Sequence, residues 1–185
     1  MTRDEGWNLL NQYTKSDSLI KHALAVEAAL RHYAAHFGEN VETWGVTGLI
    51  HDFDYERWPN PPDHTREGAK ILRERGVEEE IVGAILSHAE WNREEYPLDR
   101  PIRKALWAVD ELCGFVTAVA YVRPERLAGM AASSVRKKMK QKSFAAAVKR
   151  EDLEKGAQLL GLPLDEHVNH AIAAMKTVAG PLGFG

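Results

Sequence analysis

The chain has 185 residues, of which 44% are hydrophobic, and this is enough for one domain of ordinary size to bury a continuous core. Its 24 basic and 27 acidic residues leave a net charge of -3, so no overall positive field attracts nucleic acid. We therefore expect a single domain over residues 1–185 and no nucleic-acid partner.

The cysteine content and the length of the apolar runs indicate the cellular compartment in which the protein is expected. Cys113 is the only cysteine, so the chain cannot form an internal disulfide and does not require an oxidising environment. The first residues, MTRDEGWNLLNQYTKSD, lack the basic start and apolar run of a signal peptide. The other apolar runs are far shorter than the roughly 20 residues needed to cross a bilayer. We expect a cytoplasmic protein without membrane contact, whose oligomeric state the sequence leaves unknown.

The first half of the chain predicts helices separated by one proline-rich loop. Apolar residues recur at helical spacing and nowhere alternate as a half-buried strand requires, so the predicted fold class is all-α, a helical bundle. A long helix is expected from a cap at Asp17 or Ser18 to Gly38, and a second over about 42–50. Three prolines within 53–63 exclude a helix there, after which Asp63 is suited to an N-cap.

The second half of the chain predicts further helices. Two are expected over about 64–75 and 78–89, and Pro101 suits the first turn of a long helix that ends before Pro124. The segment 124–178 predicts three or four shorter helices. The tail AGPLGFG, residues 179–185, is rich in small residues and is expected to fray.

Three ionisable residues, His22, His88 and Asp110, stand on apolar helical faces. A carboxylate on an apolar stripe is costly unless it meets a cation, a donor or a metal, so Asp110 needs a partner. A single buried histidine is most often a hydrogen-bonded core residue. Together with the adjacent pair His51 and Asp52, however, these residues offer imidazole and carboxylate ligands that suit zinc, manganese or iron.

The order of these residues matches a family pattern. His22, then His51-Asp52 within GLIHDFDYE, then Asp110 within AVDEL resembles the H…HD…D signature of the HD superfamily of metal-dependent phosphohydrolases. The resemblance covers about residues 18–122 and leaves a C-terminal helical extension over about 124–178. It implies a helical bundle in which these four residues, from different helices, hold a divalent metal.

Two further histidines, His64 and His88, lie between the HD pair and the last aspartate. This arrangement is similar to family members that bind two metals, in which the aspartate of the HD pair bridges both ions. The implied ligands are His22, His51, Asp52, His64, His88 and Asp110, holding one or two ions of Mn, Fe, Zn, Co or Mg. The alternative is that His64 is an exposed residue of a first helical turn.

The residues after the HD pair depart from the commonest family motif. Many relatives continue with a small residue and a lysine, whereas this chain continues with Phe53-Asp54-Tyr55-Glu56, so a ready phosphate contact is missing. Asp54 is a candidate catalytic residue that would take a proton from an attacking water or anchor a substrate hydroxyl. It is equally suited to capping the loop. Candidates for neutralising a substrate phosphate, each equally suited to a solvated surface position, are Arg57, Arg66, Lys70 and Lys104.

Other histidine pairs and a basic run are interpreted as structural. His32 and His36 lie one turn apart but lack the glutamate of a metalloprotease helix, and His167 and His170 have no further ligands nearby in sequence. The basic residues within 136–142 are typical of a solvated helix face.

The resemblance implies hydrolysis of a phosphate ester in a small molecule, a nucleotide or related phosphorylated metabolite, without a covalent protein intermediate. Two alternatives remain open at this point. Some relatives with six ligands, including myo-inositol oxygenase, use two irons to activate dioxygen. A noncatalytic regulator that binds a nucleotide or a protein is the other. Intact metal ligands argue against the regulator, and the ligand types alone do not separate the two enzymes.

Overall fold

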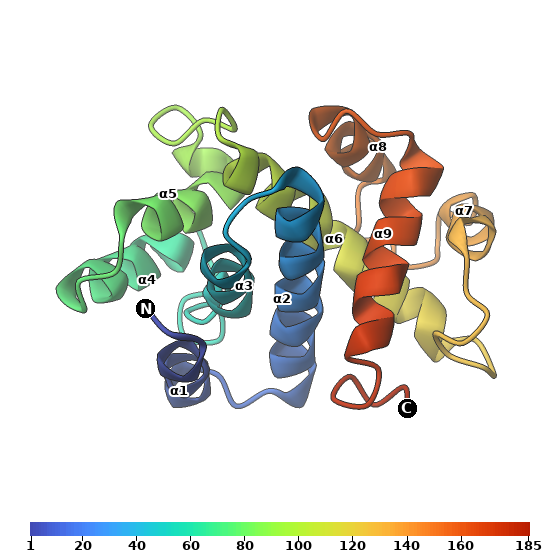
Figure 1. Cartoon of the computed structure of the whole chain (residues 1–185), viewed down its shortest axis with the longest axis horizontal. Helices are drawn as coiled ribbons and strands as arrows, with labels where there is room; N and C mark the ends of the chain where they lie inside the picture. Colours follow the sequence, from blue (N-terminus) through green and yellow to red (C-terminus); the bar gives the residue numbers. More distant parts are fainter.

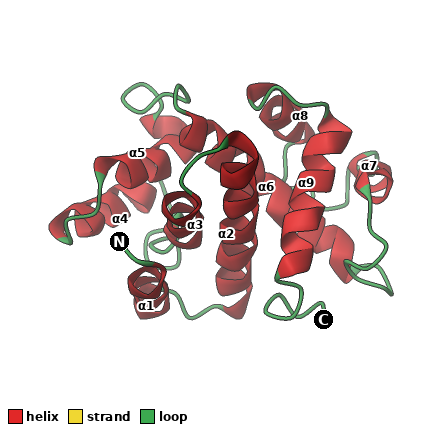
Figure 2. Ribbon diagram, in the orientation of Figure 1, coloured by secondary structure: helices red, strands yellow, loops and turns green.

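The computed structural model describes residues 1–185 as an all-helical fold with nine α-helices, one short 3-10 turn and no strand (Figures 1 and 2). The helices are α1 (Arg3–Tyr13), α2 (Asp17–Phe37), α3 (Val41–Ile50), α4 (Asp63–Glu74), α5 (Glu79–His88), α6 (Pro101–Tyr121), α7 (Ala132–Met139), α8 (Arg150–Leu159) and α9 (Leu164–Thr177). The 3-10 turn η1 covers Glu90–Asn92. The predicted fold class is confirmed, and the boundaries of α2 to α6 lie within one or two residues of those expected.

Helix α1 was not expected from the sequence. It begins with a capping box in which the Thr2 hydroxyl accepts a hydrogen bond from the Glu5 amide and the Glu5 carboxylate accepts one from the Thr2 amide. Leu9 and Leu10 are buried on its inner face. The local caps and this apolar pair explain why the segment is helical.

Two hydrophobic clusters lie on either side of α2, which stands in the middle of the molecule (Figure 1). One cluster consists mainly of residues from α1, α3, α4 and α5, and the other mainly of residues from α2, α6 and the C-terminal helices. Gly48 lets α3 approach α2 closely, because a Cβ there would lie 2.8 Å from the Val26 carbonyl oxygen. This close packing brings the end of α3 next to the first half of α2.

The first turn of α4 is irregular. His64 has extended dihedral angles and Thr65 has a φ of 66°, so regular helix begins only after Thr65. Asp63 makes no side-chain cap, contrary to expectation. The Asp54 carboxylate instead accepts hydrogen bonds from the Thr65 amide at 2.8 Å and the Gly68 amide at 3.0 Å. The kink is therefore held by a carboxylate from the preceding loop.

The prediction that residues 179–185 fray is wrong. Leu182 and Phe184 are buried, and the Phe184 ring lies 5.0 Å from the Tyr121 ring at the end of α6. Apolar burial holds this tail in place despite its small residues.

None of the helices has the length and apolar character that crossing a membrane requires.

Candidate metal centre

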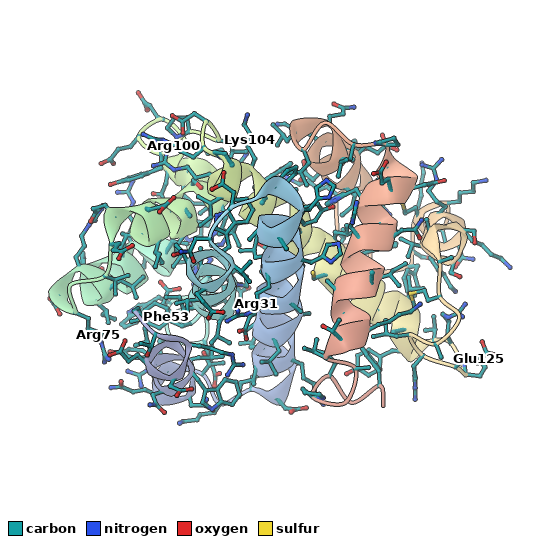
Figure 3. The ribbon with its side chains drawn as sticks, viewed as in Figure 1. Arg31, Phe53, Arg75, Arg100, Lys104 and Glu125 are labelled. Atoms are coloured by element: carbon teal, nitrogen blue, oxygen red, sulfur yellow. The ribbon has the colours of Figure 1, made fainter.

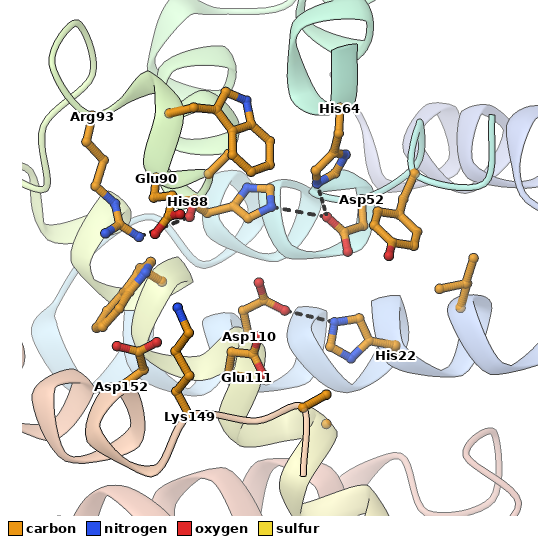
Figure 4. Close-up of a pocket in the computed structure, with 17 residues that line it drawn as sticks. His22, Asp52, His64, His88, Glu90, Arg93, Asp110, Glu111, Lys149 and Asp152 are labelled. Carbon is orange, nitrogen blue, oxygen red and sulfur yellow. Dashed lines mark hydrogen bonds and ion pairs between the residues drawn. The ribbon is translucent and has the colours of Figure 1, made fainter. Parts of the chain in front are cut away.

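The structure brings together all six residues that the sequence suggested as metal ligands. His22 lies on α2, His51 and Asp52 follow α3, His64 lies in the irregular start of α4, His88 ends α5, and Asp110 lies on α6. Figure 4 shows five of them around one pocket. These six residues, from four helices and the segment that follows α3, thus meet only because the chain folds.

A first group consists of His22, His51, Asp52 and Asp110, each of which offers a ligand atom within 4.8 Å of the others. The His22 Nε2 lies 2.9 Å from the Asp110 Oδ1. The His51 Nε2 lies 3.5 Å from both Asp52 Oδ2 and Asp110 Oδ1. Asp110 therefore has the partners that its place on an apolar face demands.

A second group consists of Asp52, His64 and His88. The Asp52 Oδ1 lies 3.4 Å from the His64 Nε2 and 3.2 Å from the His88 Nε2. His64 is only 5% exposed, so the interpretation of this residue as an exposed first-turn histidine is wrong. Asp52 belongs to both groups and places one carboxylate oxygen in each.

Hydrogen bonds behind the site aim the imidazoles inward. The Nδ1 of His51 donates to the Gly48 carbonyl at 2.8 Å, and that of His88 donates to the Ile85 carbonyl at 2.6 Å. Both Nε2 atoms are left free to act as ligands. Bonds of this kind typically fix the tautomer and orientation of metal-binding histidines.

Asp54 performs the same task for His64. Its Oδ1 lies 3.1 Å from the His64 Nδ1, while its Oδ2 accepts the amides at the start of α4. The side chain is buried and does not line the pocket. These contacts favour the loop-capping interpretation of Asp54, and its catalytic role stays a prediction.

The nitrogen and oxygen atoms of the candidate ligands suit a divalent metal. The His51 Nε2 and Asp52 Oδ1 are buried without any hydrogen-bond partner, which is costly for polar atoms unless another group satisfies them. Both atoms face the other candidate ligands. Imidazole nitrogens and carboxylate oxygens in this combination suit zinc, manganese and iron.

The electrostatics of the centre favour a cation. Burial lowers the pKa of His51, but the charge of Asp52 and the contact with Asp110 outweigh it and raise the pKa to about 9. Burial raises the pKa of Asp52, but His51 and the adjacent His64 and His88 hold it well below its usual range. The negative potential that favours protons on the imidazoles also favours a divalent ion among them.

The centre opens into a pocket of about 470 Å³, within the usual range for small-molecule sites. Besides the ligands, aromatic and charged side chains line it: Tyr55, Glu90, Trp91, Arg93, Trp107, Glu111, Lys149 and Asp152 (Figure 4). Lys149 and Asp152 belong to the C-terminal extension. No local motif in the sequence marks these two residues as part of the site.

The basic residues that the sequence suggested as phosphate contacts do not line this pocket. Arg57 donates to the Gln12 carbonyl, Arg66 donates to the Asn92 side chain, and Lys70 pairs with Glu67. Lys104 lies near Arg100 at the beginning of α6 and lines a different pocket (Figure 3). Their suggested role is therefore unsupported by the structure.

The other two histidine pairs join helices α2 and α9. The His32 Nε2 lies 2.7 Å from the His170 Nδ1, and the Tyr33 hydroxyl lies 2.6 Å from the His167 Nδ1. Neither pair belongs to a group of candidate metal ligands. Their contacts agree with the structural role that the sequence suggested.

Comparison with known proteins identifies one family. The model of the HD domain matches residues 19–115, a segment that contains all six candidate ligands. No solved structure matches the chain. The matched segment ends within α6, so the helices α7 to α9 lie outside it.

Proposed function

The chain belongs to the HD domain family, and on that premise we propose that it hydrolyses a phosphate ester in a small molecule, a nucleotide or related phosphorylated metabolite. The observation that carries this proposal is the pair of ligand groups that share Asp52 at the wall of an open pocket. The family supplies the reaction class, and the pocket supplies space for a small substrate.

The residues that would hold the ions are divided between the two groups. His22, His51, Asp52 and Asp110 form one site, and Asp52, His64 and His88 form the other. A divalent ion, once bound, activates water for attack and neutralises charge on the phosphate oxygens. Loss of a shared carboxylate should therefore affect both sites.

The surrounding residues orient the candidate ligands and offer surfaces that can bind the substrate. Asp54 holds the His64 ring in place, and the Gly48 and Ile85 carbonyls hold His51 and His88. The aromatic side chains of Tyr55, Trp91 and Trp107 give the pocket apolar surfaces against which the rest of the substrate can pack. No side chain in this arrangement needs to form a covalent intermediate.

The experiment combines metal analysis with a substrate screen. The protein is purified without added metal, its metal content is measured, and phosphate release is assayed for nucleotides and sugar phosphates with Mn, Co, Mg, Fe and Zn. We expect metal-dependent hydrolysis of at least one class, and its complete loss in Asp52→Asn together with the bound metal. The exposed Asp165→Asn is the matched control and should retain both.

Repeating the screen with and without dioxygen separates hydrolysis from oxygenase chemistry. Hydrolysis proceeds equally in both conditions. Iron-dependent consumption of oxygen without phosphate release would contradict the proposed function and favour a di-iron oxygenase.

A further inference from the structure

The site pocket contains more acidic than basic side chains. Its carboxylates are Asp52, Glu90, Asp110, Glu111 and Asp152, and its only lysine and arginine are Lys149 and Arg93. A phosphorylated substrate must enter against this negative charge. Even with ions bound, a free cation in the pocket would lower that electrostatic cost.

Arg93 is already engaged by the protein. Its Nε and Nη2 donate to the Ser87 and His88 carbonyls at 3.5 and 3.3 Å, and its guanidinium lies 5.1 Å from the centre of the Trp107 ring. These contacts fix the side chain against the end of α5. Arg93 therefore has little freedom to follow a substrate.

Lys149 is free to bind an anion. Its side chain is exposed at the pocket, and its ammonium makes no ion pair or hydrogen bond with any side chain or carbonyl, although Asp152 of the same pocket is only three residues away. Figure 4 shows its side chain extending between Asp152 and Glu111 among the residues that line the pocket. Among the cations of the pocket, it alone lacks a partner in the protein.

The loop that carries Lys149 is held by its neighbour. The Arg150 guanidinium donates to the carbonyls of Gln141, Phe144, Ala145 and Val148, and it lies 4.7 Å from the centre of the Phe115 ring on α6. Four carbonyls of residues 141–148 are thus bound to one side chain. This network fixes the backbone from which Lys149 extends.

The extension is also anchored directly on α6, the helix that carries Asp110. The Phe144 ring packs edge-on against Phe115 with 5.6 Å between centroids. Gly156 lets α8 approach closely, because a Cβ there would lie 3.1 Å from the Ala108 Cα. Both contacts set the position of Lys149 relative to the candidate metal ligands.

We propose that Lys149 binds the phosphate of the substrate and so determines specificity for phosphorylated molecules. The proposal rests on the proposed function. It also accounts for the missing cation after the HD pair, because Phe53-Asp54-Tyr55-Glu56 supplies none and the extension brings one to the same pocket. A lysine ammonium is a common phosphate ligand that acts as a point charge.

The test compares Lys149→Met, Lys149→Arg and the control Lys142→Met, which removes an exposed lysine of the same extension outside the pocket. Binding of inorganic phosphate to the metal-loaded protein is measured by calorimetry, and KM and kcat are measured for a phosphate ester found in the screen. We expect Lys149→Met to weaken phosphate binding and raise KM at least tenfold, with a smaller effect on kcat. Lys149→Arg should recover most of the affinity, and Lys142→Met should match the wild type.

Phosphate affinity within twofold of wild type in Lys149→Met, with metal content and melting temperature unchanged, would overturn the proposal. Failure of wild-type protein to bind phosphate would overturn it as well. The calorimetric measurement does not depend on turnover. A protein that binds phosphate through Lys149 but hydrolyses no ester would therefore refute the proposed function and support this inference.

Discussion

Asp52 is the residue that links the two candidate ion sites. Its Oδ2 lies near His51 and its Oδ1 near His64 and His88, so the two oxygens serve different neighbours. A carboxylate has enough lone pairs to bind one cation through each oxygen. Because Asp52 is common to both groups of candidate ligands, the number of bound ions depends on the residues that belong to one group alone.

His64 provides the test of ion number, because it belongs only to the second group. We expect wild-type protein to bind two ions and His64→Ala to lose one, since removal leaves that group with two ligands. The stoichiometry is measured by metal analysis after dialysis. The exposed His36→Ala should keep both ions. Wild-type protein with a single ion at saturating metal, or two ions in His64→Ala, would contradict the two-metal interpretation.

The sequence indicated which candidate ligands lie together, but it did not indicate the hydrogen bonds that hold them in place. His51 and Asp52 are adjacent and form a recognisable motif, so their role is visible locally. The bonds from the Thr65 and Gly68 amides to Asp54 span 11 and 14 residues, and no local motif marks the kink that allows them. The ligand types were therefore predictable, whereas the geometry that orients His64 was not.

Between elements, a short chain of hydrogen bonds joins α2, α9 and α6. The Tyr33 hydroxyl donates to the His167 Nδ1, and the His167 Nε2 donates to the Ala108 carbonyl at 3.1 Å. Ala108 lies two residues before Asp110 on α6. The extension thus supports the helix that carries a candidate ligand. Because burial lowers the pKa of His167, its ring is neutral, and the Nδ1 accepts while the Nε2 donates.

Burial lowers the pKa of His167 to about 4, against 6.5 for the unperturbed side chain. Between these values the unfolded chain binds more protons than the folded one, so stability falls as the pH falls from about 6.5 toward 4. Between pH 7.5 and pH 5, protonation of His167 in the unfolded chain lowers the free energy of unfolding by about 2 kcal/mol. Urea unfolding in a chelating buffer, at both pH values, measures the total change in the free energy of unfolding, of which the contribution of His167 is one part.

His167→Gln isolates this contribution, because the other histidines titrate in both proteins. At pH 7.5 the variant should have a lower free energy of unfolding than wild type. At pH 5 the difference between the two free energies should be smaller by about 2 kcal/mol. His36→Gln, which changes an exposed histidine, should follow the wild-type pH dependence. An equal difference in the free energy of unfolding between His167→Gln and wild type at both pH values would show that folding leaves the pKa of His167 unshifted.

The helices themselves were mostly predictable because their apolar spacing and end signals are local. Pro101 and Gly38 mark a beginning and an end that the structure reproduces. Helix α1 was missed because its capping box and the pair Leu9 and Leu10 form too short a pattern to stand out. The glycines of the C-terminal tail favour the prediction of a frayed end. The tail is nevertheless ordered because its apolar residues Leu182 and Phe184 are buried.

Across the whole molecule, the C-terminal extension shares a hydrophobic core with the HD segment. Twelve of the 31 residues in the larger cluster come from residues 124–185. They cover the sides of α2 and α6 that face away from α3 and α5 (Figure 1). The extension therefore completes the fold and at the same time supplies Lys149 to the pocket.

A fragment of residues 1–123 should consequently fail to fold cooperatively. Burial of one large apolar side chain contributes about 1.5–3 kcal/mol, whereas a domain is stable by only about 5–15 kcal/mol. Removing residues 124–185 exposes Tyr33 and Phe115, both fully buried in the intact chain, together with their neighbours. Near-UV circular dichroism and urea unfolding should show lost tertiary packing and no sharp transition. A fragment that unfolds cooperatively and retains the metal would show that the HD segment is stable alone, and that the extension serves the substrate pocket without being needed for the fold.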